Sequence, residues 1–306
     1  MLTQVTNTRT VYLILTVGVV AVSFAAIFIR LADAPPLVIA SYRLTIAAVV
    51  MVGLAAGSWL RSGRVAPTKL TRKDMVLLGV SSTSLALHFW VWILSLEYTS
   101  VASSVVLVTT NSFIVAVASR VLFKEALHPH TVVGIAVGIS GGVVIALGDA
   151  GGDGDLLGDL LAFGGAVAIV GYMLTGRTLR RHMSALTYNT WVYTGTAAIL
   201  LVAVTVAGGP FTGFTSATYL WMVILALVPQ VIGHSLLNWS LAHVTATAVT
   251  VAVMAEPVLA IALAIPILGE VPPWTSVLGG VLVLSGIYVA LRNRRTEAQT
   301  PVWRMN

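Results

Sequence analysis

Long apolar stretches, separated by short polar or Pro/Gly-rich breaks, are the feature that most constrains this chain. A bilayer core of about 30 Å needs roughly 20 apolar residues in one helix. Charged residues make up only 9% of the sequence, against roughly 25% in a soluble domain. We therefore predict an all-α membrane protein with ten transmembrane helices, near 11–31, 36–58, 75–96, 100–122, 131–148, 157–178, 186–207, 217–239, 245–268 and 274–291.

The positions of Lys and Arg predict how these helices are oriented. With the N-terminus in the cytoplasm, fifteen of the 17 basic residues lie on the cytoplasmic side, as the positive-inside rule requires. An even number of spans then returns the C-terminus to the cytoplasm. The first apolar stretch is too long for the h-region of a signal peptide, so we predict that it is the first span. We expect a multi-pass protein of the inner cell membrane.

Charge and composition also exclude several classes of partner. The net charge of +6 does not indicate nucleic-acid binding, because the basic residues mark loops rather than one patch. The chain has no Cys, which excludes disulfides and thiolate metal sites. The acidic loop from Asp149 to Asp159 has a calcium-like spacing but lacks the Glu that completes such a loop, so a solvated linker is favoured. We expect neither a metal nor another cofactor.

An internal repeat organises the sequence. The stretch ending at Glu125 aligns with the stretch ending at Glu270 at an offset of 145 residues, and Gly134 falls on Gly279. Each half has five predicted spans, an odd number, so the second half is expected to be inverted relative to the first, around a central cavity. The predicted parts are a cytoplasmic tail (1–10), a first repeat (11–148), an acidic periplasmic or extracellular linker (149–156), a second repeat (157–291) and a basic cytoplasmic tail (292–306).

Several motifs in these halves resemble a known family. Ser-Tyr-Arg lies in the second span, Thr-Ser-Val-Ala-Ser-Ser opens the fourth, and Lys-Glu or Gly-Glu ends the fourth and ninth before Gly-rich helices. This pattern resembles the EamA branch of the drug/metabolite transporter superfamily, from about Val11 to Arg292. The resemblance implies a ten-helix carrier of amino acids or other metabolites, often an exporter. One departure is Ser112, which stands where the second half has Pro257, so the sequence does not support a bend in the fourth span.

Glu256 is the first candidate for a substrate or coupling site. Ionisable groups at bilayer depth cost at least about 2.5 kcal/mol, so each is a functional candidate. Glu256 lies mid-span directly before Pro257, where the helix is expected to open. The repeat aligns it with Asn111. We predict that both face the cavity and that Glu256 binds a proton or a substrate ammonium; the alternative is a structural ion pair with Arg43.

Arg43, beside Tyr42 in the second span, is a further site candidate. Its guanidinium could bind a substrate carboxylate bidentately. The alternative is an architectural ion pair that joins two helices.

Two histidines recur on equivalent spans. His88 with Trp92, and His234 with Asn238, are each spaced i,i+4 and so share a helical face. A histidine with its ordinary pKa of about 6.5 can relay protons, whereas the alternative is a hydrogen-bonded packing role. We predict that Trp92 and Asn238 face the cavity.

Glu125 and Glu270 end helices shortly before prolines that can start the next ones. We predict structural or gating roles for both, through the helix dipole. The spacing of Gly134, Gly138 and Gly142 predicts close helix packing, within the chain rather than in a dimer.

Together these features predict a secondary transporter, an exporter of small metabolites such as amino acids, that works by alternating access in the lipid bilayer. Protons are a candidate coupling ion. The alternative classes are an intramembrane enzyme and a sensor or receptor. A nucleophile elbow, a zinc motif and a P-loop are absent from the sequence, so we do not expect an enzyme. No recognisable motif in the sequence indicates the substrate, the direction of transport or the oligomeric state.

Overall fold

The computed structural model describes residues 8–62, 70–99, 101–124, 128–149, 156–268 and 274–291, and within them every regular element is a helix. The helices of the first half are α1 (Thr8–Ser23), α2 (Ala25–Leu31), α3 (Pro36–Ser62), α4 (Arg72–Ser95), α5 (Val101–Thr109), α6 (Asn111–Phe123) and α7 (Pro129–Asp149). Those of the second half are α8 (Leu156–Leu179), α9 (Ala185–Val206), α10 (Ser216–Leu225), the π-helix η1 (Ala226–His234), α11 (Ser235–Ser240), α12 (Ala246–Val253), α13 (Glu256–Leu268) and α14 (Trp274–Leu291).

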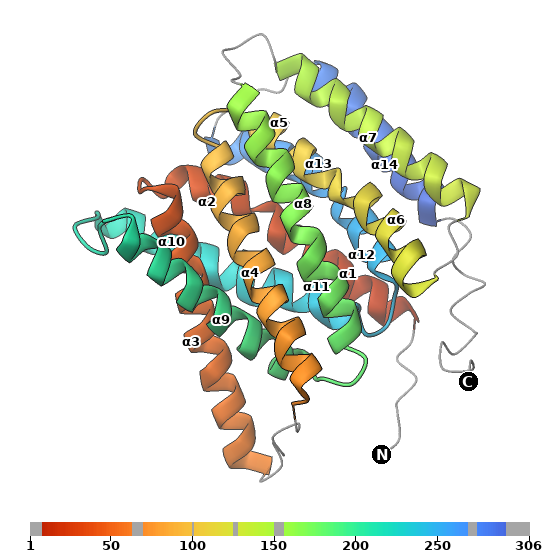
Figure 1. Cartoon of the computed structure of the whole chain (residues 1–306). Coiled ribbons are helices and arrows are strands. Elements are labelled where there is room, and N and C mark those ends of the chain that lie inside the picture. The colour runs from red at the N-terminus through yellow and green to blue at the C-terminus, as the bar shows by residue number, and fades with distance from the viewer. Residues whose placement is uncertain are drawn as a thin grey trace.

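The prediction of an all-helical membrane protein is confirmed. Seven of the described helical stretches are long and apolar enough to cross a bilayer, and three further apolar helices are shorter. The helices pack side by side in one bundle (Figure 1). Large apolar side chains such as Leu60, Val121 and Trp274 lie exposed on its outside, as lipid-facing residues do.

Four of the predicted spans are interrupted near their middles. Phe24 separates α1 from α2, Thr110 separates α5 from α6, and residues 254–255 separate α12 from α13. Between α10 and α11 the chain winds as the π-helix η1, which contains Pro229. A proline removes one backbone donor and distorts the turn before it, which explains η1 and the α12–α13 break at Pro257.

The α5–α6 break corrects the expectation that the fourth span lacks a bend. Asn111 is the first residue of α6, and Glu256, the residue aligned with it in the repeat, is the first residue of α13. Here polar side chains act in place of a proline: the Thr110 hydroxyl donates to the carbonyl of Leu107 at 2.6 Å, and Asn111 Nδ2 donates to that of Val108 at 2.7 Å. Such bonds compete with the helical ladder and bend helices.

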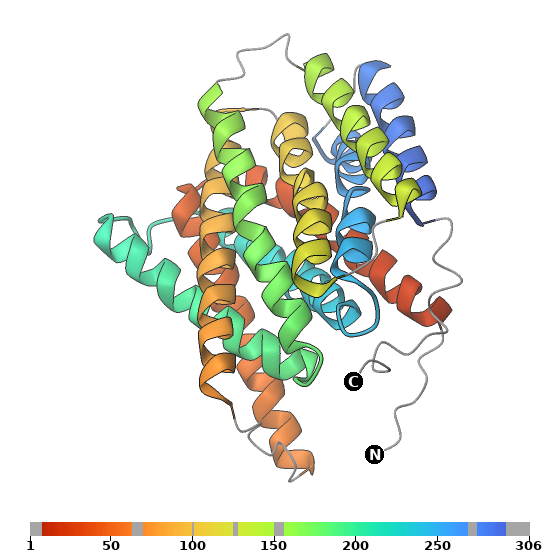
Figure 2. The same cartoon turned by 45° about the vertical axis from the view of Figure 1, so that its right-hand side comes forward.

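Helices α7 and α14 lie alongside each other at one edge of the bundle in both views (Figure 1; Figure 2). A methyl group on Gly134 would lie 2.5 Å from the Gly286 carbonyl oxygen, and one on Gly141 would lie 2.6 Å from that of Gly279. The repeat aligns Gly134 with Gly279 and Gly141 with Gly286. The same two aligned positions therefore meet twice, as Gly134 with Gly286 and as Gly279 with Gly141. Gly134 thus packs within the chain.

Gly286→Ala is expected to destabilise this helix pair. The added methyl would lie 2.5 Å from Gly134 O and Gly138 N, both backbone atoms, so the helices must separate. Overpacking of this kind costs about 1–3 kcal/mol, so thermal unfolding in detergent should occur at a lower temperature than in the wild type. The matched control is Gly79→Ala, because a methyl group added there would meet no atom within 4 Å apart from the backbone of its own helix. Equal melting of both variants would contradict the packing role.

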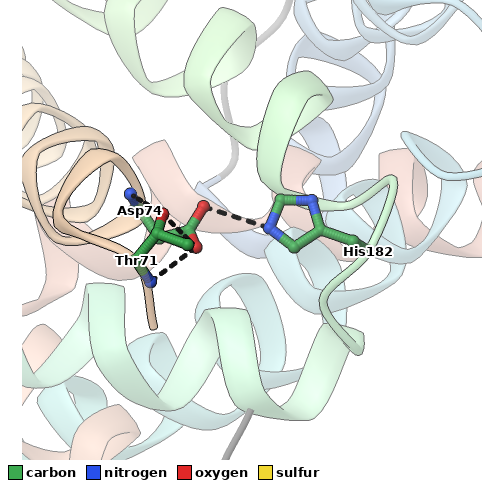
Figure 3. A network of polar contacts seen from close by, with 3 residues as sticks. All are labelled: Thr71, Asp74 and His182. Atoms are coloured by element: carbon green, nitrogen blue, oxygen red, sulfur yellow. Dashed lines mark hydrogen bonds and ion pairs between the residues drawn. The ribbon is translucent and has the colours of Figure 1, made fainter. Parts of the chain in front are cut away.

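A polar network holds the start of α4 against the loop between α8 and α9 (Figure 3). Thr71 and Asp74 form a capping box, in which Asp74 N donates to the Thr71 hydroxyl at 3.1 Å and Thr71 N donates to the Asp74 carboxylate at 3.0 Å. The other carboxylate oxygen lies 3.1 Å from Nε2 of His182. One carboxylate therefore both caps α4 and ties it to a loop more than a hundred residues away.

Thr71→Ala should lower the stability of the protein by about 1 kcal/mol, the usual cost of losing an N-cap. The midpoint of thermal unfolding in detergent is the measurement. His182→Ala keeps the cap and is the control, expected to cost less because the His182 side chain is 48% exposed. An unchanged midpoint in Thr71→Ala would show that the cap does not hold α4.

Candidate functional site

A cavity of about 50 Å³ lies inside the bundle. One water molecule needs about 10–15 Å³, so the cavity can hold a larger group. Most of the wall surface is apolar, as is typical of a small-molecule site, but half of the described lining residues carry a polar or titratable group. In the described part of the chain, these polar and titratable residues are Arg43, His88, Trp92, Asn111, Tyr172, His234, Thr250 and Glu256.

The interrupted helices meet at this cavity. Val22 and Ala25 flank the α1–α2 break, Asn111 and Glu256 begin α6 and α13, and His234 ends η1; all five line the cavity. Because Pro257 has no N–H, the carbonyl of the residue four positions earlier lacks its usual helical donor. Broken membrane helices expose such backbone groups where they line a binding site.

The structure brings most of the candidate residues together. Six of them line the cavity: Arg43, His88, Trp92, Asn111, His234 and Glu256. Asn238 and Tyr42 are not among the described lining residues. The Tyr42 hydroxyl instead donates to the carbonyl of Phe211, in the α9–α10 connection. Pro257 follows Glu256 at the start of α13, whereas Glu125 and Glu270 lie outside the described residues.

Arg43 is fully buried and is held on two sides. Its Nε donates to Oε1 of Gln230 at 2.8 Å, and its guanidinium carbon lies 3.9 Å from the centre of the Phe89 ring. Its terminal nitrogens Nη1 and Nη2 have no hydrogen-bond partner in the described part of the chain. No ion pair within 4.0 Å joins Arg43 to Glu256 there, so the direct architectural pair that the sequence suggested is not formed in this structure.

The two candidate histidines both contact the ring of Phe89. His88 Nδ1 lies 2.9 Å from the carbonyl oxygen of Gly165, and the ring stacks on Trp92 at 5.7 Å. The carbonyl can only accept, so His88 Nδ1 carries a proton and donates it to this bond. His234 packs edge-on against Phe89 at 5.4 Å. The Nε1 donor of Trp92 is buried without a partner in the described chain.

Asn238 belongs to a buried network beside the cavity. Its Nδ2 donates to the Tyr172 hydroxyl at 2.6 Å and to Oδ1 of Asn189 at 2.7 Å. Tyr172 is the cavity-lining member. The Tyr188 ring packs on Tyr172, and its hydroxyl lies 2.7 Å from that of Ser81. The network thus links α4, α8, α9 and α11 at one end of the cavity.

Two arginines at the end of α8 extend this network. Arg180 Nε donates to the Asn238 carbonyl at 3.0 Å, and its Nη1 donates to the carbonyl of Met183. Arg177 Nη1 donates to the carbonyl of Leu241 at 2.9 Å. Burial lowers the pKa of Arg180 to about 10, so it is still charged at neutral pH. A cation is favourable at the C-terminal end of α11, where carbonyls lack helical donors.

Sequence reasoning missed Gln230 and Phe89 as neighbours of Arg43. A polar residue at bilayer depth beside a proline is a signal for Gln230, since Pro229 precedes it. Phe89 carried no signal, because an aromatic ring in an apolar helix usually packs or faces lipid.

A bundle of membrane-length helices, with interrupted spans around an internal cavity, is typical of a membrane transporter. The sequence pattern of the EamA-like transporter family matches residues 9–147 and again 156–292. The chain therefore belongs to the EamA-like transporter family.

Individual relatives are distant. An uncharacterized transporter of Archaeoglobus fulgidus is 25% identical over 292 residues, 92% of this chain and 97% of its own. A probable terminal-alkyne amino-acid exporter of Streptantibioticus cattleyicolor is 29% identical over 206 residues, 63% of this chain and 68% of its own. A solved crystal structure with 21% identity covers 95% of this chain and 100% of its own with a TM-score of 0.78, which shows a shared fold.

Proposed function

We propose that this transporter is an exporter of small amphipathic metabolites such as amino acids, and that the central cavity is its substrate site. The observation that carries the proposal is the meeting of interrupted helices at a cavity that holds both Arg43 and Glu256. A cation and a carboxylate in one mostly apolar cavity suit a molecule with groups of both charges. The similarity to a probable terminal-alkyne amino-acid exporter supports the same substrate class.

The mechanism that we propose is alternating access between two inverted five-helix halves. The protein would lie in the inner cell membrane, cross it ten times and have both termini in the cytoplasm. The reciprocal Gly134–Gly286 and Gly141–Gly279 contacts support a twofold relation between the halves. The basic residues at the ends of α6 and α8 support the orientation. A bound molecule can move such an equilibrium only by its different affinity for the two states.

Proton exchange at Glu256 is the proposed source of coupling. Glu256 begins α13 at a break, and its repeat partner Asn111 begins α6 in the same cavity wall. The two sites are therefore related, but only one can carry a charge. His88 and His234 line the same cavity and are the other candidates for proton transfer.

The test is uptake of a labelled panel of amino acids and related metabolites into proteoliposomes that contain the purified full chain, with protein-free liposomes as the control. We expect saturable uptake with counterflow for at least one compound. Uptake that responds to an imposed pH gradient would support proton coupling. The absence of flux for a broad panel would contradict the proposal and favour a receptor or an enzyme.

A further inference from the structure

Three buried donors point to an acceptor that the protein does not supply. Nη1 and Nη2 of Arg43 and Nε1 of Trp92 have no hydrogen-bond partner in the described chain, and both side chains line the cavity. Arg43 is 0% exposed and Trp92 is 4% exposed. Donors buried in this way are normally satisfied, and an unsatisfied set at a cavity wall suggests a ligand.

The position of the guanidinium defines the shape of that acceptor. Gln230 occupies the Nε side, and the Phe89 ring covers one face, so both groups restrict rotation of the guanidinium. The edge that carries the two terminal nitrogens is left without a partner. Two parallel N–H groups on that edge match the two oxygens of a carboxylate, which an Arg side chain binds bidentately.

Charge balance favours a carboxylate over a dianion. Glu256 lines the same cavity yet does not pair with Arg43 within 4.0 Å in the described structure. The Arg43 guanidinium and an ionised Glu256 carboxylate together carry no net charge. A monoanion with a cationic amine keeps this balance, whereas a dianionic phosphate would add uncompensated negative charge to an apolar site.

We propose that Arg43 and Trp92 form a carboxylate subsite of the transport cavity, with Gln230 and Phe89 as positioning residues. The subsite binds the carboxylate of the transported molecule, so a substrate must carry that group. The inference rests on the proposed function of the cavity as the substrate site. It differs from that proposal in naming the group that is recognised and the residues that recognise it.

The experiment is equilibrium binding of amino acids and of their matching amides to the purified full chain in lipid nanodiscs. The two sets of probes share side chains and the amine and differ only in the carboxylate. We expect at least one amino acid to bind about tenfold or more tightly than its amide, since hydrogen bonds to charged groups are worth a factor of this order or larger. Transport of the same pairs is measured in parallel in proteoliposomes.

The variants test which residues cause the preference. Arg43→Gln should bind acid and amide about equally, and Arg43→Lys, which keeps the charge, should lose most of the preference because it lacks the planar fork. Gln230→Met should reduce the acid-to-amide ratio several-fold by freeing the guanidinium, a readout that lost stability alone would not move. Arg30→Gln is the matched control, because Arg30 is exposed at the end of α2.

Each outcome bears on the proposals separately. Equal binding of acids and amides to the wild type would overturn the subsite and leave the transport function intact. A preference for acids without any flux would support the subsite and contradict the transport function. An unchanged preference in folded Arg43→Gln or Arg43→Lys would also overturn the subsite.

Discussion

Glu256→Gln is expected to abolish the response of transport to a pH gradient. A glutamine has nearly the shape of a protonated glutamate but cannot take up or release a proton at this position. Uptake in the presence of an imposed gradient should therefore fall to the level measured without a gradient, because the group that would exchange the proton is gone. Exchange of labelled for unlabelled substrate at equal pH on both sides should continue.

The measurement is initial uptake in proteoliposomes with and without the gradient. The other described charged or titratable groups that line the same cavity are Arg43, His88, Tyr172 and His234. Of these, the two histidines are the alternative proton carriers, because an arginine keeps its charge and a tyrosine ordinarily titrates far above neutral pH. Glu256→Asp should retain part of the response. Asp159→Asn is the matched control, since it removes a carboxylate that accepts from Thr99 at 3.0 Å and does not line the cavity.

If gradient-driven uptake in Glu256→Gln equals that of the wild type, Glu256 is not the coupling residue. The two histidines would then be tested in the same assay. Loss of both gradient-driven uptake and exchange would instead indicate a role for Glu256 in binding the substrate.

Asn238→Leu is expected to have the largest effect on stability. Its side-chain amide donates to both Tyr172 and Asn189, and its backbone carbonyl accepts from Arg180, all in a buried region. A leucine keeps the backbone carbonyl but leaves Tyr172 and Asn189 without the side-chain donor. Each buried group left unsatisfied costs about 1–3 kcal/mol, so for the two groups we expect a loss of about 2–6 kcal/mol in the free energy of unfolding.

The loss is measured as the change in chemical or thermal unfolding in detergent. Ser240→Ala is the control on the same helix: its hydroxyl donates only to the Leu236 carbonyl, so its removal should cost less than about 1 kcal/mol. If Asn238→Leu melts like the wild type, the network does not hold α8, α9 and α11 together.

Much of the helical architecture could be predicted from the sequence. The hydrocarbon core sets the length of a span, so apolar stretches near 72–95 or 185–206 could be located to within a few residues. The break at Pro257 was also predictable, since proline acts on its own helix. Glu256 and Arg43 were predictable as candidates because charges are costly at bilayer depth.

The arrangement of the site could not be predicted in the same way. The bend at Thr110 depends on hydrogen bonds from side chains to the carbonyls of Leu107 and Val108. Thr and Asn also occur in straight helices, so their presence in the sequence does not predict a bend. Tyr42 and Arg43 are neighbours in sequence, but only Arg43 lines the cavity, because successive residues of a helix point about 100° apart. Asn238 shares a helical face with His234 yet bonds to Tyr172 and Asn189 instead.

The sequence by itself determined that this chain is a helical membrane protein, and it located the long apolar stretches and the charged groups inside them, because the bilayer acts on each segment locally. Only the tertiary structure decided which partner each group has. Arg43 contacts Gln230 and Phe89 rather than Glu256, and Arg43, Gln230 and Phe89 come from three different elements. Such contacts depend on how helices that are distant in the sequence pack together, so a local sequence pattern does not predict them.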